Sequence, residues 1–197
     1  MMKPILAIAL AALILFGASF GLQGIAANNA QEAHIAMMQT LLPGSETFTA
    51  EPYTGDDANI VSVHKSDIGF VIETVTYGYA GNITMLIGVN NDGYVTGLVV
   101  KEAHETFGLG NQALTDHVFL SQFLNGTGSF AVATHGEADA FSSATGADTA
   151  ADEGEAIEVD ALTGATVTTK AVIRCVNSAI AYVTGADTSS SATSWGG

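Results

Sequence analysis

The start of the chain is almost entirely apolar. Residues 5–27 carry no charge, and about 20 such residues suffice for a helix to cross the hydrocarbon core of a bilayer. The pattern predicts a transmembrane anchor within residues 1–27. Because Lys3 precedes this stretch and the next positive charge after it is Lys65, the N-terminus is expected in the cytoplasm and the remainder outside the cell membrane. A cleaved signal peptide is the alternative, and it also exports the chain.

Beyond this stretch, the periodicity of apolar residues predicts an α+β domain. Residues 28–44 have apolar positions at helical spacing before Pro43 and Gly44, which predicts a juxtamembrane helix. Four later runs are rich in β-branched residues and bounded by turn residues, so they predict an antiparallel meander. These runs are residues 60–63, 69–75, 83–89 and 94–100.

Flanking helices and short strands complete the expected domain. Residues 112–124 and 168–183 each place their apolar side chains on one helical stripe. Short strands are expected at residues 130–133 and 156–159.

Two segments are expected to be flexible. Residues 136–155 are rich in small and acidic residues and have little apolar bulk, so they predict an acidic surface loop. Residues 185–197 predict a disordered tail. The folded domain is therefore expected to run over residues 45–184.

Charge and cysteine content exclude several functions. The chain has 5 Lys+Arg against 20 Asp+Glu, a formal net charge of −15. So negative a protein repels a polyanion, which excludes nucleic acid as a partner. The single cysteine excludes an internal disulfide and a cysteine-rich metal site. The histidines show no ligand spacing, so no metal site is expected.

A turn of small residues between the last expected strand and helix is the strongest chemical signal. Residues 160–169 read DALTGATVTT, and Lys170 and Arg174 follow in the same helix. Such a helix start offers unpaired N–H donors and the positive end of the helix dipole, which suits a phosphate group. On spacing alone, a helix cap at Thr166 or Thr168 is the competing interpretation.

This turn is similar to a known motif. Asp160-x-x-Thr163-Gly164-Ala165-Thr166 resembles the flavinylation motif Asp-x-x-(Ser/Thr)-Gly-Ala-(Thr/Ser) of FMN-binding domains. Two earlier segments also resemble patterns of this family, and they occur in the family's order. Residues 78–83 resemble its Gly-Tyr-x-Gly pattern. Residues 105–110 resemble its Glu-Thr-Pro-Gly-Leu-Gly pattern, with Phe107 where the family usually has proline.

The resemblance implies a covalent cofactor. In the family, a Mg-dependent flavin transferase takes FAD and leaves FMN on the threonine oxygen through a phosphoester, and the corresponding residue is Thr166. The remaining cofactor-binding residues that the resemblance indicates are Asp160, Thr163, Gly164, Ala165, Val167, Thr168, Glu105, Thr106, Leu109 and Gly110.

Residues 3–184 together resemble the G subunits of Rnf-type electron-transport complexes. This implies a membrane-bound subunit that relays electrons beside other subunits of a complex coupling ferredoxin/NAD chemistry to ion translocation, without catalysing the overall reaction alone. A component of a sodium-translocating quinone reductase or a free-standing exported flavin relay is the first alternative. A cofactor-free anchored binding domain is the second.

Overall fold

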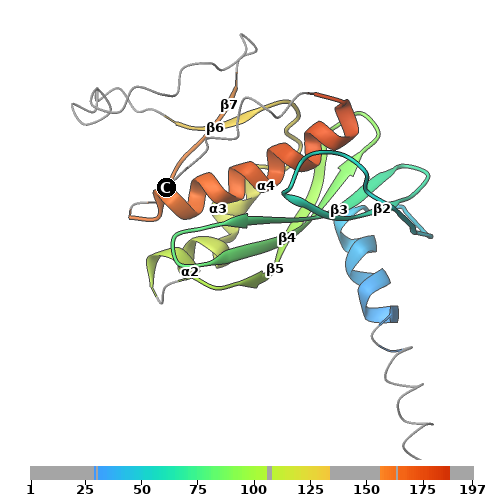
Figure 1. The fold of residues 1–197 in the computed structure, drawn as a ribbon, viewed down its shortest axis with the longest axis horizontal. Helices are drawn as coiled ribbons and strands as arrows, with labels where there is room; N and C mark the ends of the chain where they lie inside the picture. Colours follow the sequence, from blue (N-terminus) through green and yellow to red (C-terminus); the bar gives the residue numbers. More distant parts are fainter. Residues whose placement is uncertain (1–28, 30, 106–107, 134–155, 163, 187–197) are drawn as a thin grey trace, which may run out of the picture. The chain divides into compact units, whose positions relative to one another are not determined.

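The computed structural model describes residues 29, 31–105, 108–133, 156–162 and 164–186. The chain divides into two units, residues 1–38 and residues 39–197. The described residues of the first unit are helical. In the second unit, a curved sheet carries the long helix α4 across one face (Figure 1).

Five antiparallel strands form this sheet in sequence order, as the meander predicts. The β4–β5 hairpin closes on Asn90, whose side-chain oxygen accepts hydrogen bonds from the backbone N–H of Asp92 at 3.1 Å and of Tyr94 at 2.8 Å. Asparagine favours turns for this reason. The strands are β1 (Thr49–Glu51), β2 (Ile60–Lys65), β3 (Gly69–Tyr77), β4 (Asn82–Asn90) and β5 (Val95–Ala103).

The core lies between the sheet and α4 (Thr166–Thr184). The helix packs over β3 and β4 (Figure 1), and its apolar stripe faces the sheet as the 3.6-residue period predicts. Phe119 and Phe123 close the core beside it, with ring centroids 5.5 Å apart. Buried apolar residues of α4 include Ala171, Val172, Cys175, Val176, Ala179 and Ile180.

The opposite face of the sheet contacts the chain near Leu41. Gly88 of β4 pairs with Gly97 of β5, and a Cβ atom at either position would collide with the Leu41 backbone. The Thr96 hydroxyl donates a hydrogen bond to the Leu41 carbonyl oxygen at 2.6 Å. The glycine pair therefore lets one backbone lie directly on another.

A separate parallel pair of strands leads into α4. These are β6 (Phe130–Val132) and β7 (Ile157–Val159). The Asn177 side chain of α4 accepts a hydrogen bond from the Phe130 N–H at 2.9 Å and donates one to the Phe130 carbonyl at 3.0 Å. This contact attaches β6 to α4, and β6 in turn pairs with β7, the strand from which the chain enters the helix.

The single helix predicted over residues 112–124 is two short helices. They are α2 (Leu109–Thr115) and α3 (His117–Ser121). Asp116 between them is extended, and its carboxylate accepts hydrogen bonds from two N–H groups in the first turn of α3 at 2.8 and 3.3 Å. Aspartate favours such caps over helix interiors, so it ends one helix and starts the next.

The prediction of a membrane-spanning helix is corrected. Across the part of the chain that the structure describes, no helix has both the length and the apolar character needed to cross a bilayer. The expected span at residues 5–27 itself lies outside the described residues. The described fold is an α+β domain with an antiparallel sheet and helices, and the expectation of a single-pass protein with an extracytoplasmic domain was wrong. The acidic loop at residues 136–155 and most of the tail at residues 185–197 also fall outside the described residues.

Candidate functional site

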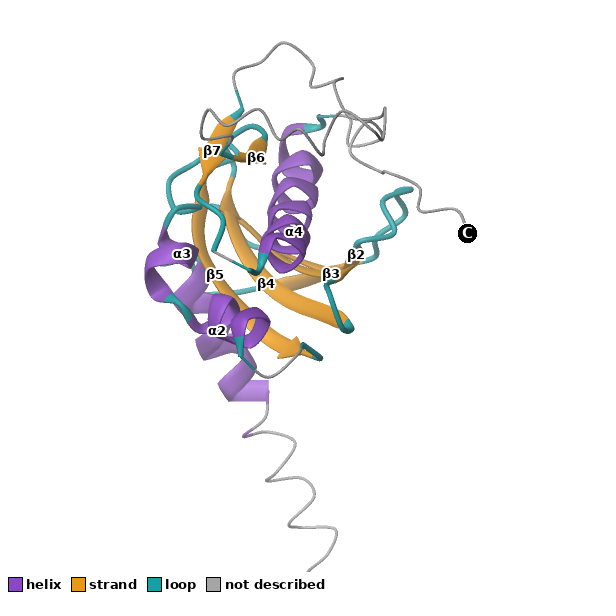
Figure 2. Ribbon diagram, turned by 90° about the vertical axis from the view of Figure 1, so that its left-hand side faces the viewer, coloured by secondary structure: helices purple, strands orange, loops and turns teal. Residues whose placement is uncertain are grey.

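Three segments that are distant in sequence meet at the start of α4. They are the turn between β3 and β4, the stretch that leaves β5 and enters α2, and the first turn of α4 itself. Figure 2 turns the domain so that α2, α3 and α4 are seen together. These segments contain both halves of the pattern found in the sequence.

Glu105 joins the three segments. Its Oε1 atom accepts a hydrogen bond from the Tyr79 backbone N–H at 2.7 Å, and a Cβ atom at Gly78 would collide with the same oxygen. A Cβ atom at Gly110 would lie 2.9 Å from Glu105 Oε2 and 3.3 Å from Thr168 Oγ1. The two glycines therefore make room for the carboxylate beside α4.

Two buried polar atoms here have no hydrogen-bond partner among the described residues. They are Glu105 Oε2 and Thr169 Oγ1. An unsatisfied buried polar group costs roughly 1–3 kcal/mol, and native proteins rarely retain one. The arrangement therefore fits a ligand that presents a hydrogen-bond donor to Glu105 and shares the polar surroundings of the helix start.

Helix α4 begins at a residue whose side chain makes no capping hydrogen bond. Its N-cap is Ala165, and Thr166 and Thr168 both lie inside the helix, so neither is the cap considered from spacing. Gly164 has φ +79°, a conformation that favours glycine. Thr166 and Val167 are exposed, whereas Ala165 and Thr168 are buried. The Thr166 hydroxyl is thus accessible at the positive end of the helix dipole.

Asp160 is held by a side chain that the sequence analysis missed. Its backbone N–H donates a hydrogen bond to Gln122 Oε1 at 2.8 Å, and Gln122 Nε2 donates to its carbonyl at 3.5 Å. Leu162 packs against the core a little further on. Gln122 directly follows α3, and no sequence pattern could relate it to Asp160, which lies 38 positions away.

The structure brings together most of the predicted cofactor residues. Glu105, Gly110 and Thr168 are in mutual proximity, and the backbone of Leu109 begins α2. Gly164, Ala165, Thr166 and Val167 are consecutive at the helix start. Thr106, Phe107 and Thr163 lie outside the described residues. The binding role of each residue stays a prediction.

Cys175 is unsuited to nucleophilic chemistry. Burial raises the pKa of its thiol, and the hydrogen bond between the thiol and the Thr76 hydroxyl offsets this only in part. The sulfur lies 3.3 Å from Thr76 Oγ1, between α4 and β3. A buried neutral thiol is a poor nucleophile, so Cys175 is a core residue, as its position in the helix indicates.

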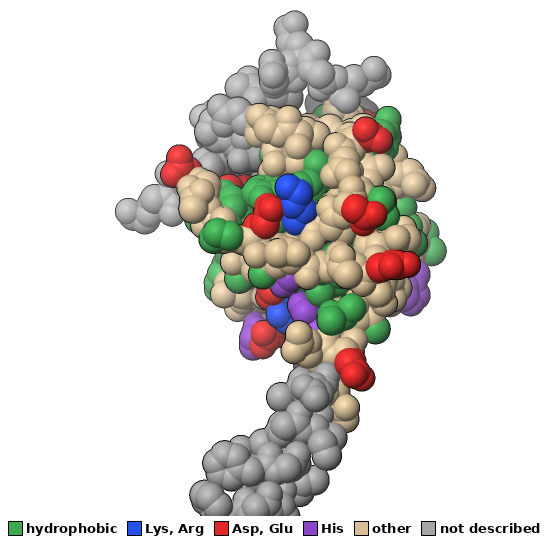
Figure 3. Space-filling view, turned by 90° about the vertical axis from the view of Figure 1, so that its right-hand side faces the viewer, with side chains coloured by type: hydrophobic (Ala, Val, Ile, Leu, Met, Phe, Trp, Pro, Cys, Tyr) green, Lys and Arg blue, Asp and Glu red, His purple; other side chains and the backbone are tan. Residues whose placement is uncertain are grey.

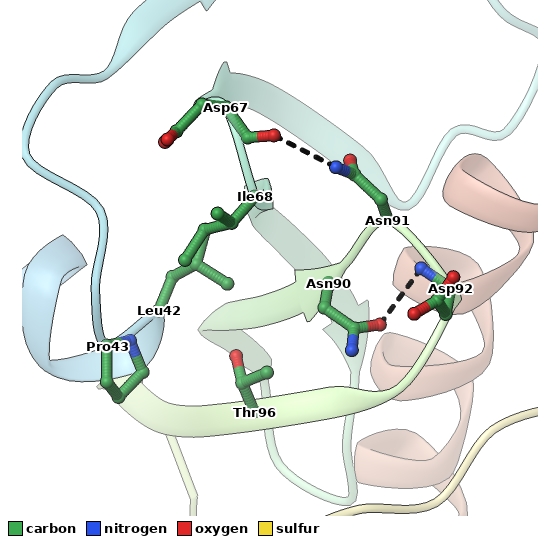
Figure 4. A pocket seen from close by; sticks show the side chains of 8 residues that line it. All are labelled: Leu42, Pro43, Asp67, Ile68, Asn90, Asn91, Asp92 and Thr96. Atoms are coloured by element: carbon green, nitrogen blue, oxygen red, sulfur yellow. Dashed lines mark hydrogen bonds between the residues drawn. The ribbon is translucent and has the colours of Figure 1, made fainter.

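Two cavities lie away from this site. The larger has a volume of about 540 Å³ and lies beside the β4–β5 turn, where Asn91 donates a hydrogen bond to the Asp67 carbonyl at 3.0 Å (Figure 4). The smaller, of about 200 Å³, lies near Tyr182. None of the predicted cofactor residues lines either cavity.

Comparison with known families assigns the class of protein. Residues 78–181 match the family model of the FMN-binding domain. This match covers more than half of the chain and includes all three segments that meet at the start of α4. The chain belongs to the FMN-binding domain family.

Beyond the family, the chain is similar to a curated protein. The chain is similar to the G subunit of the Na(+)-translocating ferredoxin:NAD(+) oxidoreductase complex of Acetobacterium woodii, with 40% identity over 47 residues. The matched stretch covers 23% of this chain and 23% of that protein. Family membership and this similarity support the expectation that the chain is a flavin-binding electron-transfer protein and that its cofactor is FMN.

Proposed function

We propose that this chain is an electron-transfer subunit that carries FMN covalently on Thr166. The observation that supports the proposal most is the exposed Thr166 in the first turn of a helix whose N-cap, Ala165, makes no capping hydrogen bond, within a segment that matches the FMN-binding domain. FMN supplies one- and two-electron redox chemistry when bound, and the protein fixes its position and electrostatic surroundings.

The residues of the site fit the two ends of such a cofactor. The first turn of α4 offers backbone N–H donors and the positive end of the helix dipole to a phosphate on Thr166. Lys170, exposed one turn later, adds a positive charge. Glu105 Oε2, buried and unpaired among the described residues, would accept a hydrogen bond from an N–H group of the flavin ring system. The absence of a side chain at Gly110 is what allows this carboxylate to lie beside α4.

Attachment would need a separate flavin transferase that uses FAD. The Thr166 oxygen would form a bond to the phosphorus of the FMN half, the pyrophosphate bond of FAD would break, AMP would leave, and the hydroxyl proton would pass to a base. The redox state of the flavin does not change in this step. Asp160, held near the turn by Gln122, would keep the turn in the shape that the transferase recognises.

We also propose a place for the chain in a larger assembly. The similarity to a component of a ferredoxin:NAD(+) oxidoreductase complex supports a role as one subunit of an Rnf-type, ion-translocating complex. In that role the chain would relay electrons between neighbouring subunits and would not perform the overall reaction alone. An affinity tag on the chain in its native host would then recover the other subunits in fixed ratio, and recovery of the chain alone would contradict the assembly.

Intact-mass measurement tests the attachment directly. Natively produced chain is expected to show the added mass of one FMN phosphoester, and a denaturing gel should show flavin fluorescence in the same band. Thr166→Ala should abolish both signals. Because Thr166 is exposed, this substitution should change the free energy of unfolding by no more than about 0.5 kcal/mol.

Thr163→Ala is the matched control, since it removes a neighbouring hydroxyl of the same motif. It should retain the added mass on the peptide that contains Thr166. An unmodified wild-type chain from a host that makes the transferase, or an added mass that survives Thr166→Ala, would contradict the proposed attachment.

A further inference from the structure

We propose that the surface beside Thr166 is the docking site of an acidic partner protein. We name this surface the basic-aromatic patch, and it consists of Tyr77, Tyr79, Val167, Lys170 and Arg174. The inference rests on the proposed function in that a flavin on Thr166 would lie at the edge of the patch.

Positive charge without an ion-pair partner is concentrated in this patch. Four cations belong to the part of the chain that the structure describes. Lys65 and Lys101 each pair with a glutamate, at 3.5 and 2.8 Å. Lys170 and Arg174 form no ion pair with any described residue. The unneutralised positive charge of the described domain therefore lies on the first half of α4.

The helix and the β3–β4 turn hold the patch together. Positions 166, 170 and 174 are four apart and share one face of α4. The Arg174 guanidinium donates a hydrogen bond to the Tyr77 carbonyl at 2.9 Å, which fixes the turn against the helix. Residue 174 lies about 12 Å along the axis from Thr166, so Arg174 remains available when a phosphate occupies the helix start.

The patch also exposes large apolar side chains. Tyr77 is 64% exposed, Tyr79 is 67% exposed and Val167 is 47% exposed. The turn that carries the two tyrosines is closed by a hydrogen bond from Gly78 N–H to the Gly81 carbonyl at 2.8 Å. Tyrosine and arginine are enriched among the hot spots of protein interfaces. Because the backbone that carries the two rings is already fixed, docking of a partner would cost little conformational entropy in this turn.

The charge of the rest of the protein indicates the sign of the partner. The chain has a formal net charge of −15. Figure 3 shows acidic side chains scattered over one face of the molecule, where the visible basic side chains lie close to acidic or histidine side chains. An acidic partner would be repelled by most of this surface and attracted at the patch, which would orient it toward Thr166. A basic partner would find many acidic surfaces and no preferred orientation.

Nuclear magnetic resonance titration of the full chain without flavin tests the docking site. The probe is oxidised flavodoxin, a small acidic electron carrier. Amide signals of the basic-aromatic patch should shift, and the double variant Lys170→Glu/Arg174→Glu should bind roughly ten-fold more weakly, since two exposed charge pairs are lost. The control Lys65→Glu/Lys101→Glu changes the net charge equally and should weaken binding less than about two-fold, since long-range interactions are screened at ordinary salt.

Three results would overturn the proposal. Equal weakening in the two double variants would mean that only net charge matters. Shifts confined to other faces of the domain would place the contact elsewhere. Self-association of the chain in sedimentation experiments, lost in Lys170→Glu/Arg174→Glu, would make a second copy the occupant. Amide spectra of both double variants that retain the wild-type dispersion show that neither has lost its fold.

The docking site and the proposed attachment can fail separately. The titration uses the chain without flavin, so an unmodified Thr166 in native material leaves its result intact. Conversely, a flavin found on Thr166 together with equal binding of the two double variants would remove the docking site alone.

Discussion

The two ends of α4 belong to one continuous helix but are completed in different ways. At its end, Gly185 adopts φ +72°, and its N–H donates to the Ala181 carbonyl at 2.8 Å. The Thr184 hydroxyl donates to the Ile180 carbonyl at 3.0 Å. At its start, the N-cap residue is Ala165, whose side chain makes no capping hydrogen bond. One end therefore satisfies its backbone within the chain, and the other leaves its donors available.

Side-chain packing differs between the ends in the same way. Tyr182 packs against the rings of Tyr53 and Phe70, with centroids 5.9 and 5.6 Å apart. Around the start, Val167 is exposed and Glu105 Oε2 is buried without a partner among the described residues. The far end of the helix is thus held by packing and by bonds within the chain, whereas its start retains buried polar atoms without a partner among the described residues.

The largest expected effect on stability is at the far end. Tyr182→Ala removes an aromatic contact with two rings and should lower the free energy of unfolding by about 2 kcal/mol. Val167→Ala is the matched change at the start and should alter it by no more than about 0.5 kcal/mol. Urea unfolding measures both. Equal losses at the two positions would contradict the proposed difference between the ends of α4.

A smaller effect is expected from the two glycines that flank the helix. Gly164→Ala and Gly185→Ala each place a side chain at positive φ, at +79° and +72°, which should cost about 1 kcal/mol in each variant. Flavin attachment should fall only in Gly164→Ala, because only that turn presents Thr166. The flavin fluorescence per mole of folded protein checks this. A comparable fall in Gly185→Ala would mean that attachment reports overall stability rather than the local turn.

The smallest effect concerns the middle of the helix at high pH. Burial raises the pKa of the Cys175 thiol above its ordinary value of 9.0, so the folded state keeps the proton that the unfolded chain releases. This contribution to stability is complete below pH 9.0 and declines as the pH rises above it. The free energy of unfolding should therefore fall less between about pH 7 and about pH 10 in Cys175→Ala than in wild type.

Tyr182 contributes a decline of the same sign, because burial also raises the pKa of its phenol. This contribution is common to the wild type and Cys175→Ala and cancels in their difference. An identical pH dependence in the two proteins would show that the thiol has no part in it.

The regular elements were largely predictable because their sequences repeat with a clear period. The strands of the meander and the stripe of α4 follow alternation and helical spacing, and the observed elements differ from these ranges by a few residues at their ends. The division at Asp116 was missed because the apolar stripe runs across it, while the cap depends on one carboxylate. The membrane helix was predicted from hydropathy alone and has no counterpart among the described helices.

The candidate site was predictable as two motifs but not as a geometry. Their order along the chain identified the family, which the match over residues 78–181 confirms. The position of Glu105 between Gly78 and Gly110 depends on how β3, β5 and α4 pack, and no local pattern encodes it. The same holds for Gln122, whose contact with Asp160 joins residues that only the fold brings together.

The glycine pair of the sheet has a practical consequence for anyone who shortens this protein. Gly88 and Gly97 are covered by the backbone at Leu41, which Thr96 also holds. A version of the chain starting at Ser45 would remove the buried Leu41 and Leu42 side chains and the Thr96 hydrogen bond, and it would open this face of the sheet to solvent. Expression designs that retain residues 39–44 keep this cover and should yield protein that aggregates less.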